Sequence, residues 1–340
     1  MALESQNNVE AGGSGALAEA EKPNGEPPLI EVESLSKNFG SIVAVDRISF
    51  ALRRGEVLGF LGPNGAGKST TMRMITGYLP ASAGRVRICG ADIENDANAA
   101  KRRIGYLPEG APLYSDMSPE AFLNFVASVR GLGGAQRARR VADVIAQLQL
   151  GEVLHRRIDT LSKGFKRRVG LAQALVHDPD VLILDEPTDG LDPNQKHTVR
   201  QLIHAIGASK AIIVSTHLLE EVDAICARTI VIDHGRIVGG GTPEELRRLA
   251  PDHNAVILRV DRRDGARAAD LLRADAALAS VDMMDEGDAA ELHIVPAKGA
   301  SIADLVAAKL RDNGIAFHDF RTESGKLDEV FRKLTLRAAA

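Results

Sequence analysis

Gly62-Pro63-Asn64-Gly65-Ala66-Gly67-Lys68-Ser69-Thr70 is the stretch from which the architecture of this 340-residue chain can be inferred. It fits G-x-x-x-x-G-K-[ST], a loop that wraps the phosphates of a nucleotide. The glycines let backbone N–H groups point into one concavity, Lys68 adds a mobile positive charge, and Ser69 offers a hydroxyl to Mg²⁺. The helix that follows presents its positive end to the same anion. The sequence therefore predicts a site for ATP or GTP.

The residues on either side give this loop the context that it needs. Val57–Leu61 predicts a buried strand, and residues 70–75 predict the start of a helix. A strand, a glycine loop and a helix in this order are typical of the α/β fold of P-loop NTPases. A bland glycine turn would lack both neighbours.

Composition and charge bound the class of protein. Hydrophobic residues make up 44% of the chain and charged residues 26%, which is ordinary for a globular protein of two or so folded units. The net charge of -4 gives no reason to expect a nucleic-acid partner. Cys89 and Cys226 fit no metal or redox spacing, so we expect reduced, buried thiols. No apolar run approaches the roughly 18–20 residues of a membrane span, and no secretory signal is visible, so we expect a cytoplasmic chain.

Changes in sequence pattern divide the chain into three parts. Residues 1–28 carry five Glu against one Lys and show no periodicity, which predicts a disordered acidic tail. Residues 29–249 begin with short strands, adopt helical spacing over about 109–175, and then return to apolar strand patterns. Residues 250–340 follow the order β-α-β-β-α-β and end in a helix, which predicts a small α+β, ferredoxin-like accessory domain.

The same patterns predict individual elements. In the first folded part we expect strands at 29–32, 42–45, 48–52, 181–184 and 211–214, a hairpin of 229–232 with 236–238, and helices at 121–130, 137–150, 166–176 and 244–249. In the second we expect strands at 255–260, 278–283, 291–295 and 315–321, and helices at 267–273, 302–313 and 326–334.

A second motif supplies the acids that nucleotide hydrolysis needs. Val181-Leu182-Ile183-Leu184-Asp185-Glu186 places four apolar residues before an acidic pair at the carboxyl end of a strand. Asp185 is suited to hold Mg²⁺, usually through water, and Glu186 to polarise the attacking water. The alternative is a strand that merely ends in two acids, which the phosphate loop upstream disfavours.

Three further motifs complete a set that resembles a known family. Leu161-Ser162-Lys163-Gly164-Phe165 runs into a helix, Gly190-Leu191-Asp192-Pro193 follows the acidic pair, and Ser215-Thr216-His217 ends the next strand. With the two nucleotide motifs they closely resemble the Walker A, signature, Walker B, D-loop and switch-histidine motifs of the ABC-type ATPases. The resemblance covers residues 29–249 and implies an ABC ATPase domain that binds ATP and Mg²⁺.

The resemblance implies roles for individual residues. Phe39 matches the aromatic that stacks on adenine, although a Phe at such a place is more often part of a core. Ser162 and Gly164 match the signature residues that reach the γ-phosphate of the partner's ATP across a head-to-tail dimer. Asp192 matches the D-loop residue at the dimer seam. His217 matches the switch histidine that contacts the γ-phosphate, whereas a lone His is more often structural.

Two positions depart from the commonest family pattern. Lys163 replaces the first glycine of the signature, which puts the backbone geometry there in question and adds a charge that helps to neutralise phosphate. Glu109 stands where most members have Gln; it still supplies an oxygen for Mg²⁺ or water but adds a negative charge. The expected metal ligands are therefore Ser69, Asp185 and Glu109.

Both departures are familiar within one branch of the family. The runs 104–109, 161–165 and 327–334 look like those of ABC-2 type exporter ATPases, most closely the gliding-motility-associated subset. This resemblance implies an ATP-hydrolysing motor that forms a homodimer or pairs with another ABC ATPase. The resemblance also implies that this motor drives an integral membrane permease on another chain. We therefore expect a peripheral location on the inner face of the plasma membrane.

Two other classes stay open as alternatives. The basic clusters 137–140, 156–157 and 166–168 invite a soluble ABC ATPase that acts on nucleic acid or ribosomes, but a solvated helix face explains them better. Such ATPases resemble tandem nucleotide domains or one domain split by a coiled coil, and this chain has a single motif set. A P-loop kinase for a small molecule would need neither the signature nor the D-loop.

Overall fold

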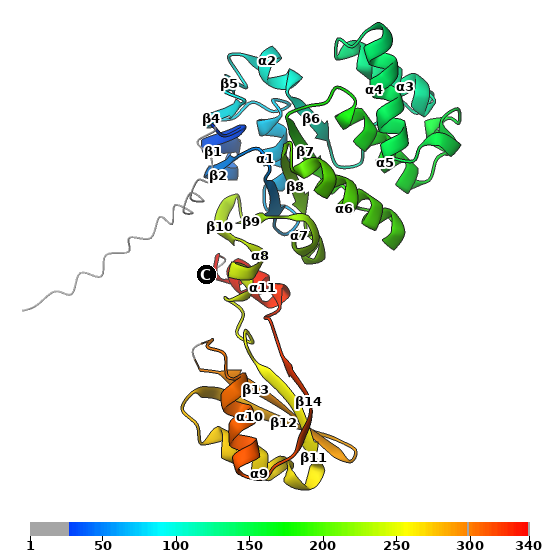
Figure 1. The fold of residues 1–340 in the computed structure, drawn as a ribbon. Helices are drawn as coiled ribbons and strands as arrows, with labels where there is room; N and C mark the ends of the chain where they lie inside the picture. Colours follow the sequence, from blue (N-terminus) through cyan, green and yellow to red (C-terminus); the bar gives the residue numbers. More distant parts are fainter. Residues whose placement is uncertain (1–26, 298, 339–340) are drawn as a thin grey trace, which may run out of the picture.

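The computed structural model describes residues 27–297 and 299–338, which form a larger and a smaller unit (Figure 1). The acidic tail predicted at the N-terminus lies almost wholly outside these residues. The larger unit contains two sheets and the smaller unit one. Within the described ranges, no helix is both long and apolar enough to cross a membrane.

The larger unit consists of β1 to β10 and α1 to α8. Its strands are β1 (Ile30–Phe39), β2 (Ile42–Leu52), β3 (Val57–Leu61), β4 (Ala83–Ile88), β5 (Ala91–Asp92), β6 (Ile104–Leu107), β7 (Val181–Asp185), β8 (Ala211–Thr216), β9 (Arg228–Asp233) and β10 (Arg236–Gly241). Its helices are α1 (Lys68–Ile75), α2 (Ala97–Arg102), α3 (Pro119–Val129), α4 (Gly134–Gln147), α5 (Lys163–Leu175), α6 (Pro193–Gly207), α7 (Leu219–Ile225) and α8 (Pro243–Arg247). Six of these elements were not predicted from the sequence: β4, β5, β6, α2, α6 and α7.

A six-stranded sheet forms the centre of the larger unit, in the order β10-β9-β3-β8-β7-β6. All neighbouring strands are parallel except β9 and β10, which form the predicted hairpin. Every residue of β3, β6, β7 and β8 is buried. Consecutive apolar residues are what a parallel sheet covered on both faces requires, so the predicted parallel strands are confirmed.

A four-stranded antiparallel sheet, ordered β2-β1-β4-β5, shares a hydrophobic core with one face of the central sheet. The two separate strands expected at 42–45 and 48–52 are wrong, because both belong to β2. Arg47 lies within β2 at a positive φ of 47°. Register shifts between β1 and β2 absorb the irregularity, as in a β-bulge, so the strand continues through the polar interruption.

Helices α3, α4 and α5 pack together where helical spacing was expected. The basic clusters 137–140 and 166–168 lie on α4 and α5, and 156–157 lies between these two helices. Arg157 is exposed and forms ion pairs with Asp116 and Asp159. The expectation of a solvated face at 166–168 is wrong for two of its residues: Arg167 and Arg168 are only 5% and 7% exposed. Both donate hydrogen bonds to backbone carbonyls, so they face neither water nor nucleic acid.

The smaller unit has the predicted order of elements. It consists of β11 (Val256–Asp261), α9 (Arg262–Arg273), β12 (Leu278–Glu286), β13 (Ala289–Pro296), α10 (Ala303–Asp312) and β14 (Phe317–Thr322). Its strands form an antiparallel sheet ordered β12-β13-β11-β14, and α9 and α10 pack on the sheet (Figure 1). Residues of β11 and β13 alternate between buried and half-buried, as in a sheet covered on one face.

The last helix, α11 (Leu327–Ala338), lies against the larger unit (Figure 1). It contacts α8 and β10, and Leu334 packs directly over Gly239. Ahead of α11 the chain pairs with the segment that leads into the smaller unit. The Asn254 N–H donates to the Glu323 carbonyl at 2.9 Å, and the Glu323 N–H donates to the Ala255 carbonyl at 2.8 Å. Two hydrogen-bonded segments therefore connect the units.

Candidate active site

Four loops that carry predicted functional residues begin at one edge of the central sheet. The phosphate loop follows β3, Glu109 follows β6, Glu186 follows β7 and His217 follows β8. Because these strands are parallel, their carboxyl ends bring together loops that are far apart in the sequence. This edge is where most of the predicted site residues meet.

The backbone of the phosphate loop explains its glycines. Gly67 has a φ of 104° immediately before α1, and Gly65 has a φ of 82°. A Cβ on Gly62 would lie 2.4 Å from the Ile232 carbonyl oxygen, and one on Gly67 would lie 2.7 Å from the Ala44 carbonyl oxygen. Side chains at these positions would strain the backbone or collide with it. The glycines therefore let the loop pack closely against its neighbours directly ahead of the positive end of α1.

Lys68 is folded back onto the phosphate loop. It is 6% exposed, and its Nζ donates to the carbonyl oxygens of Gly62 at 2.7 Å and Pro63 at 3.1 Å. Burial lowers the pKa of Lys68, while the carboxylates of Glu186, Asp185 and Glu109 act in the opposite direction. All three predicted acids therefore lie within electrostatic reach of this ammonium group.

Asp185 is oriented by Ser215, a residue that the motifs alone do not predict. Asp185 is 1% exposed, and its carboxylate accepts a hydrogen bond from the Ser215 hydroxyl on the neighbouring strand β8. A buried carboxylate held in this way is positioned for a cation or an ordered water. The run Ser215-Thr216-His217 predicts a role only for its histidine, because the pairing of β7 with β8 cannot be seen in the sequence.

Glu186 occupies a left-handed backbone conformation, with a φ of 52°. Such a conformation costs on the order of 1–3 kcal/mol for a residue other than glycine, so the surroundings must hold it. The Glu186 N–H donates to the Ser215 carbonyl at 3.1 Å, and the Glu186 carbonyl accepts from the Asp189 N–H at 3.2 Å. Its carboxylate oxygens lie 2.9 Å from Nδ1 of His217. The predicted base and the switch histidine are therefore in direct contact.

Ser162, Gly164 and Asp192 form a second cluster, at the starts of α5 and α6. The Ser162 hydroxyl accepts from the Phe165 N–H at 3.3 Å, and Asp192 accepts from the Gln195 N–H at 2.9 Å. A Cβ on Gly164 would lie 2.1 Å from Oε1 of Gln195, so the signature lies against the first turn of α6, which Asp192 caps. Both N-caps leave a polar side chain exposed at a helix N-terminus.

Lys163 removes the concern raised by its replacement of glycine. It is the first residue of α5 and takes helical geometry, so the backbone here needs no glycine. Its aliphatic stem lies against Gly190, with Cδ 3.7 Å from the position of a Cβ there. The variant signature thus keeps a regular helix start.

Phe39 ends β1 and is 50% exposed, so it is not part of a core. The Nζ of Lys37 lies 5.2 Å from the centre of the ring. Ile42 and Val43, on the other side of the turn, are 67% and 52% exposed. The aromatic expected to stack on adenine therefore has an open face.

The predicted metal ligands fit a magnesium site that is completed by a nucleotide. Ser69 lies in the first turn of α1, Asp185 ends β7, and Glu109 is exposed just after β6. Hydroxyl and carboxylate oxygens suit Mg²⁺, which usually binds one or two carboxylates together with phosphate and water. Within the described residues, no group of three His, Cys, Asp or Glu side chains is arranged to hold a metal. The donor set therefore agrees with a cation bound jointly with phosphate.

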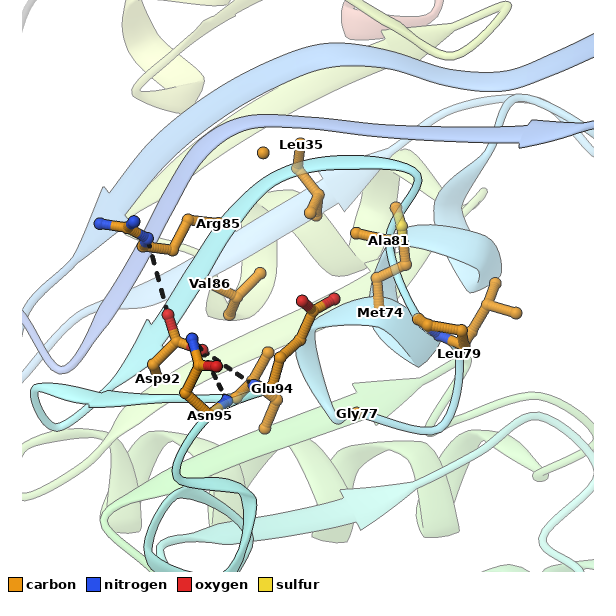
Figure 2. A pocket seen from close by; sticks show the side chains of 13 residues that line it. Leu35, Met74, Gly77, Leu79, Ala81, Arg85, Val86, Asp92, Glu94 and Asn95 are labelled. Atoms are coloured by element: carbon orange, nitrogen blue, oxygen red, sulfur yellow. Dashed lines mark hydrogen bonds and ion pairs between the residues drawn. The ribbon is translucent and has the colours of Figure 1, made fainter.

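A separate cavity of about 310 Å³ lies at the opposite end of α1 from the phosphate loop (Figure 2). Met74, Gly77 and Val86 are among the residues that line it. At its rim, Oδ1 of Asp92 accepts the backbone N–H groups of Glu94 and Asn95, both at 3.0 Å. None of the predicted site residues contributes to this cavity.

Comparison with known proteins agrees with this geometry. Residues 45–189 match the family described as ABC transporter. The chain is 38% identical over 223 residues to the Nod factor export ATP-binding protein I of Ralstonia nicotianae, which covers 65% of this chain and 70% of that protein. It is 36% identical over 219 residues to the linearmycin resistance ATP-binding protein LnrL of Bacillus subtilis, covering 64% and 70% respectively.

Solved structures give the same result. A structure described as the ATP binding subunit of an ABC transporter superposes with a TM-score of 0.61 at 31% identity, covering 65% of this chain and 92% of that one. The dimeric cassette MJ0796 bound to ADP and Pi superposes with a TM-score of 0.59 at 21% identity, covering 63% and 98%, which supports the fold alone. The chain therefore belongs to the ABC transporter family, as an ATP-binding and ATP-hydrolysing subunit of the exporter type.

Proposed function

We propose that this chain is the motor subunit of an ABC-2 type exporter and that it works as a head-to-tail dimer closing around two ATP molecules. The observation that carries the proposal is the separation of the site residues into two groups within one chain. One group lies at the carboxyl edge of the central sheet, and the other lies at the starts of α5 and α6. The first group is the phosphate loop with Glu109, Asp185, Glu186 and His217. The second group is Ser162, Gly164 and Asp192.

Nucleotide binding uses the first group. The loop 62–70 surrounds the phosphates with backbone N–H groups, and Phe39 stacks on the adenine. Lys68 exchanges the carbonyls of Gly62 and Pro63 for phosphate oxygens, so binding frees the loop carbonyls. Ser69, Asp185 and Glu109 would hold Mg²⁺, which neutralises phosphate charge when bound.

Hydrolysis uses Glu186, the acid that directly follows β7. Glu186 accepts the proton of the attacking water, and Ser215 keeps the neighbouring Asp185 oriented. In the structure the Glu186 carboxylate is engaged with His217. In the proposed cycle His217 turns to the γ-phosphate when ATP is present, which releases the carboxylate for the water. Closure of the dimer then places Ser162 and Gly164 of the second copy at the same phosphate.

An exposed aromatic patch supports a membrane partner. Tyr114, Phe125 and Val129 are 57%, 43% and 70% exposed, and the rings of Tyr114 and Phe125 lie 5.6 Å apart. Phe125 and Val129 are four residues apart on α3, so they share one face of the helix. We propose that this patch receives a cytoplasmic segment of an integral ABC-2 permease, which would hold the chain at the inner face of the plasma membrane.

The boundaries of the domains belong to the same proposal. Residues 29–249 form the ATPase domain, with about 109–175 as its helical subdomain. Residues 250–340 form an accessory region, and its last helix packs against the ATPase domain. The alternative of a nucleic-acid or ribosome ATPase gains no support from the relatives, which are export and resistance ATPases. The likeness to the gliding-motility subset stays a prediction.

The proposal can be tested by purification of the tagged full chain from detergent-solubilised membranes of its own cells. We expect an integral membrane protein to co-purify with the wild type, and its yield to fall about tenfold for Phe125→Glu, because a buried charge opposes docking. Met284→Glu is the matched control, since Met284 is 58% exposed in the smaller unit. Equal recovery of the membrane protein with both variants would contradict the patch, and recovery of none with the wild type would contradict the transport role.

A further inference from the structure

The side chain of Arg167 connects two loops of the active site. It extends from α5, and its guanidinium donates to three backbone carbonyls at the carboxyl edge of the central sheet. Nη1 lies 3.3 Å from the carbonyl oxygen of Pro108, and Nη2 lies 3.2 Å from that of Asp185. Nη2 also donates to the carbonyl oxygen of Glu186.

This arrangement is unusual for a buried cation. Arg167 is 5% exposed, and the hydrogen bonds of its guanidinium go to carbonyls. Its Nε, among the described atoms, has no hydrogen-bond partner. Burial lowers the pKa of Arg167, while Asp189, Asp185, Glu186 and Glu109 favour its charged form, the first of these most. An apolar side chain of similar size would fill the same space without this desolvation cost, so packing alone does not explain an arginine here.

The carbonyls that Arg167 binds belong to the residues whose placement matters most for hydrolysis. The Glu186 carbonyl is part of the left-handed residue that carries the proposed base. The Pro108 carbonyl immediately precedes Glu109, the proposed Mg²⁺ ligand. A planar guanidinium can hold several acceptors in a fixed arrangement, which a flexible ammonium cannot.

We propose that Arg167 is a positioning residue that sets the Glu186 turn and the Glu109 loop relative to the bound phosphates. It acts through the three carbonyls and does not touch the nucleotide. Its place in α5, five residues after Ser162, also ties the signature helix to the catalytic turn of the same chain. The inference rests on the proposed role of Glu186 as the base.

Arg168 provides a matched control on the same helix. It is 7% exposed, and its Nε likewise has no partner. Its Nη1 donates to the carbonyl oxygens of Leu148 at 3.2 Å and Gln149 at 3.3 Å, at the end of α4. The guanidinium lies 4.2 Å from the ring centre of Phe165. Arg168 is therefore charged and buried like Arg167 and also binds backbone carbonyls, but these carbonyls lie outside the catalytic turn.

The experiment compares Arg167→Gln, Arg167→Lys and Arg168→Gln in the full chain by kcat, KM for ATP and thermal midpoint. We expect Arg167→Gln to lower kcat by about 10- to 100-fold, the range seen when groups that support a ligand are removed. KM should change by less than about threefold, because the phosphate loop is untouched. Arg167→Lys should recover part of kcat, since one ammonium can bind some of the carbonyls. Arg168→Gln should lose similar thermal stability but keep kcat within about threefold.

The proposal would be overturned if Arg167→Gln and Arg168→Gln lost kcat in the same proportion to their loss of thermal midpoint. It would also be overturned if KM for ATP rose in Arg167→Gln by the same factor as kcat fell. If Arg167→Gln does not fold, Arg167→Lys carries the test, with an unchanged kcat as the contrary result. Glu186→Gln separates this inference from the proposed function. Turnover that survives Glu186→Gln contradicts the base assignment, whereas loss of turnover there with normal kcat in Arg167→Lys and Arg167→Gln contradicts only the positioning role.

Discussion

The central sheet of the larger unit and the sheet of the smaller unit differ in how they use their edges. The central strands are parallel and buried on both faces, so four loops from distant parts of the sequence begin at one edge. The strands of the smaller unit are antiparallel, so the carboxyl ends of neighbouring strands lie at opposite edges of the sheet. A parallel sheet therefore brings functional residues together at one edge. The antiparallel sheet distributes its loops over two edges and has only one of its faces covered.

The first prediction concerns Lys68, the cation at the edge where these loops meet. Lys68→Ala should lower ATP turnover by at least about 100-fold and weaken ATP binding by about 10- to 100-fold, because a charge-assisted hydrogen bond to phosphate contributes about 1.5–3 kcal/mol. Steady-state hydrolysis and equilibrium binding measure the two effects. Lys309→Ala is the control, since Lys309 pairs with Asp275 in the smaller unit. Hydrolysis that persists in Lys68→Ala would mean that the phosphates bind elsewhere.

The predicted and the unpredicted parts of this edge differ in how local they are. The phosphate loop and the pair Asp185-Glu186 were predicted because each is a continuous run with its own strand. Ser215 and Arg167 were not predicted, because the contact of Ser215 spans 30 positions of sequence and those of Arg167 span 18, 19 and 59. Arg167 was misjudged for a further reason: a run of three basic residues usually marks a solvent-exposed face.

The fold shows the same division. The β-α-β-β-α-β order of the smaller unit was predicted, since each element has its own periodicity. The division of β2 into two strands was an error, because the bulge at Arg47 resembles a turn when only the sequence is considered. The return of α11 to the larger unit could not be predicted, since it depends on Leu334 meeting Gly239 in three dimensions.

The second prediction damages the antiparallel sheet. Leu258 is fully buried in β11, so Leu258→Ala should cost the smaller unit about 2–5 kcal/mol of stability. If that unit is accessory, ATP turnover should stay within about twofold of the wild type, because the two units have separate cores. Amide hydrogen exchange should accelerate over 255–322 and be unchanged around the phosphate loop. A loss of turnover that matches the loss of protection would show that the units do not act independently.

The third prediction makes a smaller change at the catalytic edge. Glu109→Gln removes one negative charge near Lys68 and the proposed Mg²⁺ ligands. The Mg²⁺ concentration for half-maximal turnover should rise by roughly 3- to 10-fold at saturating ATP, since Mg²⁺ affinity depends on the charge of its ligands. A Mg²⁺ titration of hydrolysis measures this. An unchanged titration would assign Glu109 no part in metal binding.

The central claim, that each chain carries two half-sites, is tested most directly by the molar mass of Glu186→Gln and of Ser162→Asp/Glu186→Gln in ATP and Mg²⁺, measured by light scattering after size exclusion. Asp is a good N-cap and should keep α5 intact, but its charge would face the phosphates of the partner's ATP. Glu186→Gln should form an ATP-dependent dimer. The double variant should bind ATP with similar affinity and elute as a monomer. A dimer of the double variant as stable as that of Glu186→Gln would contradict the account.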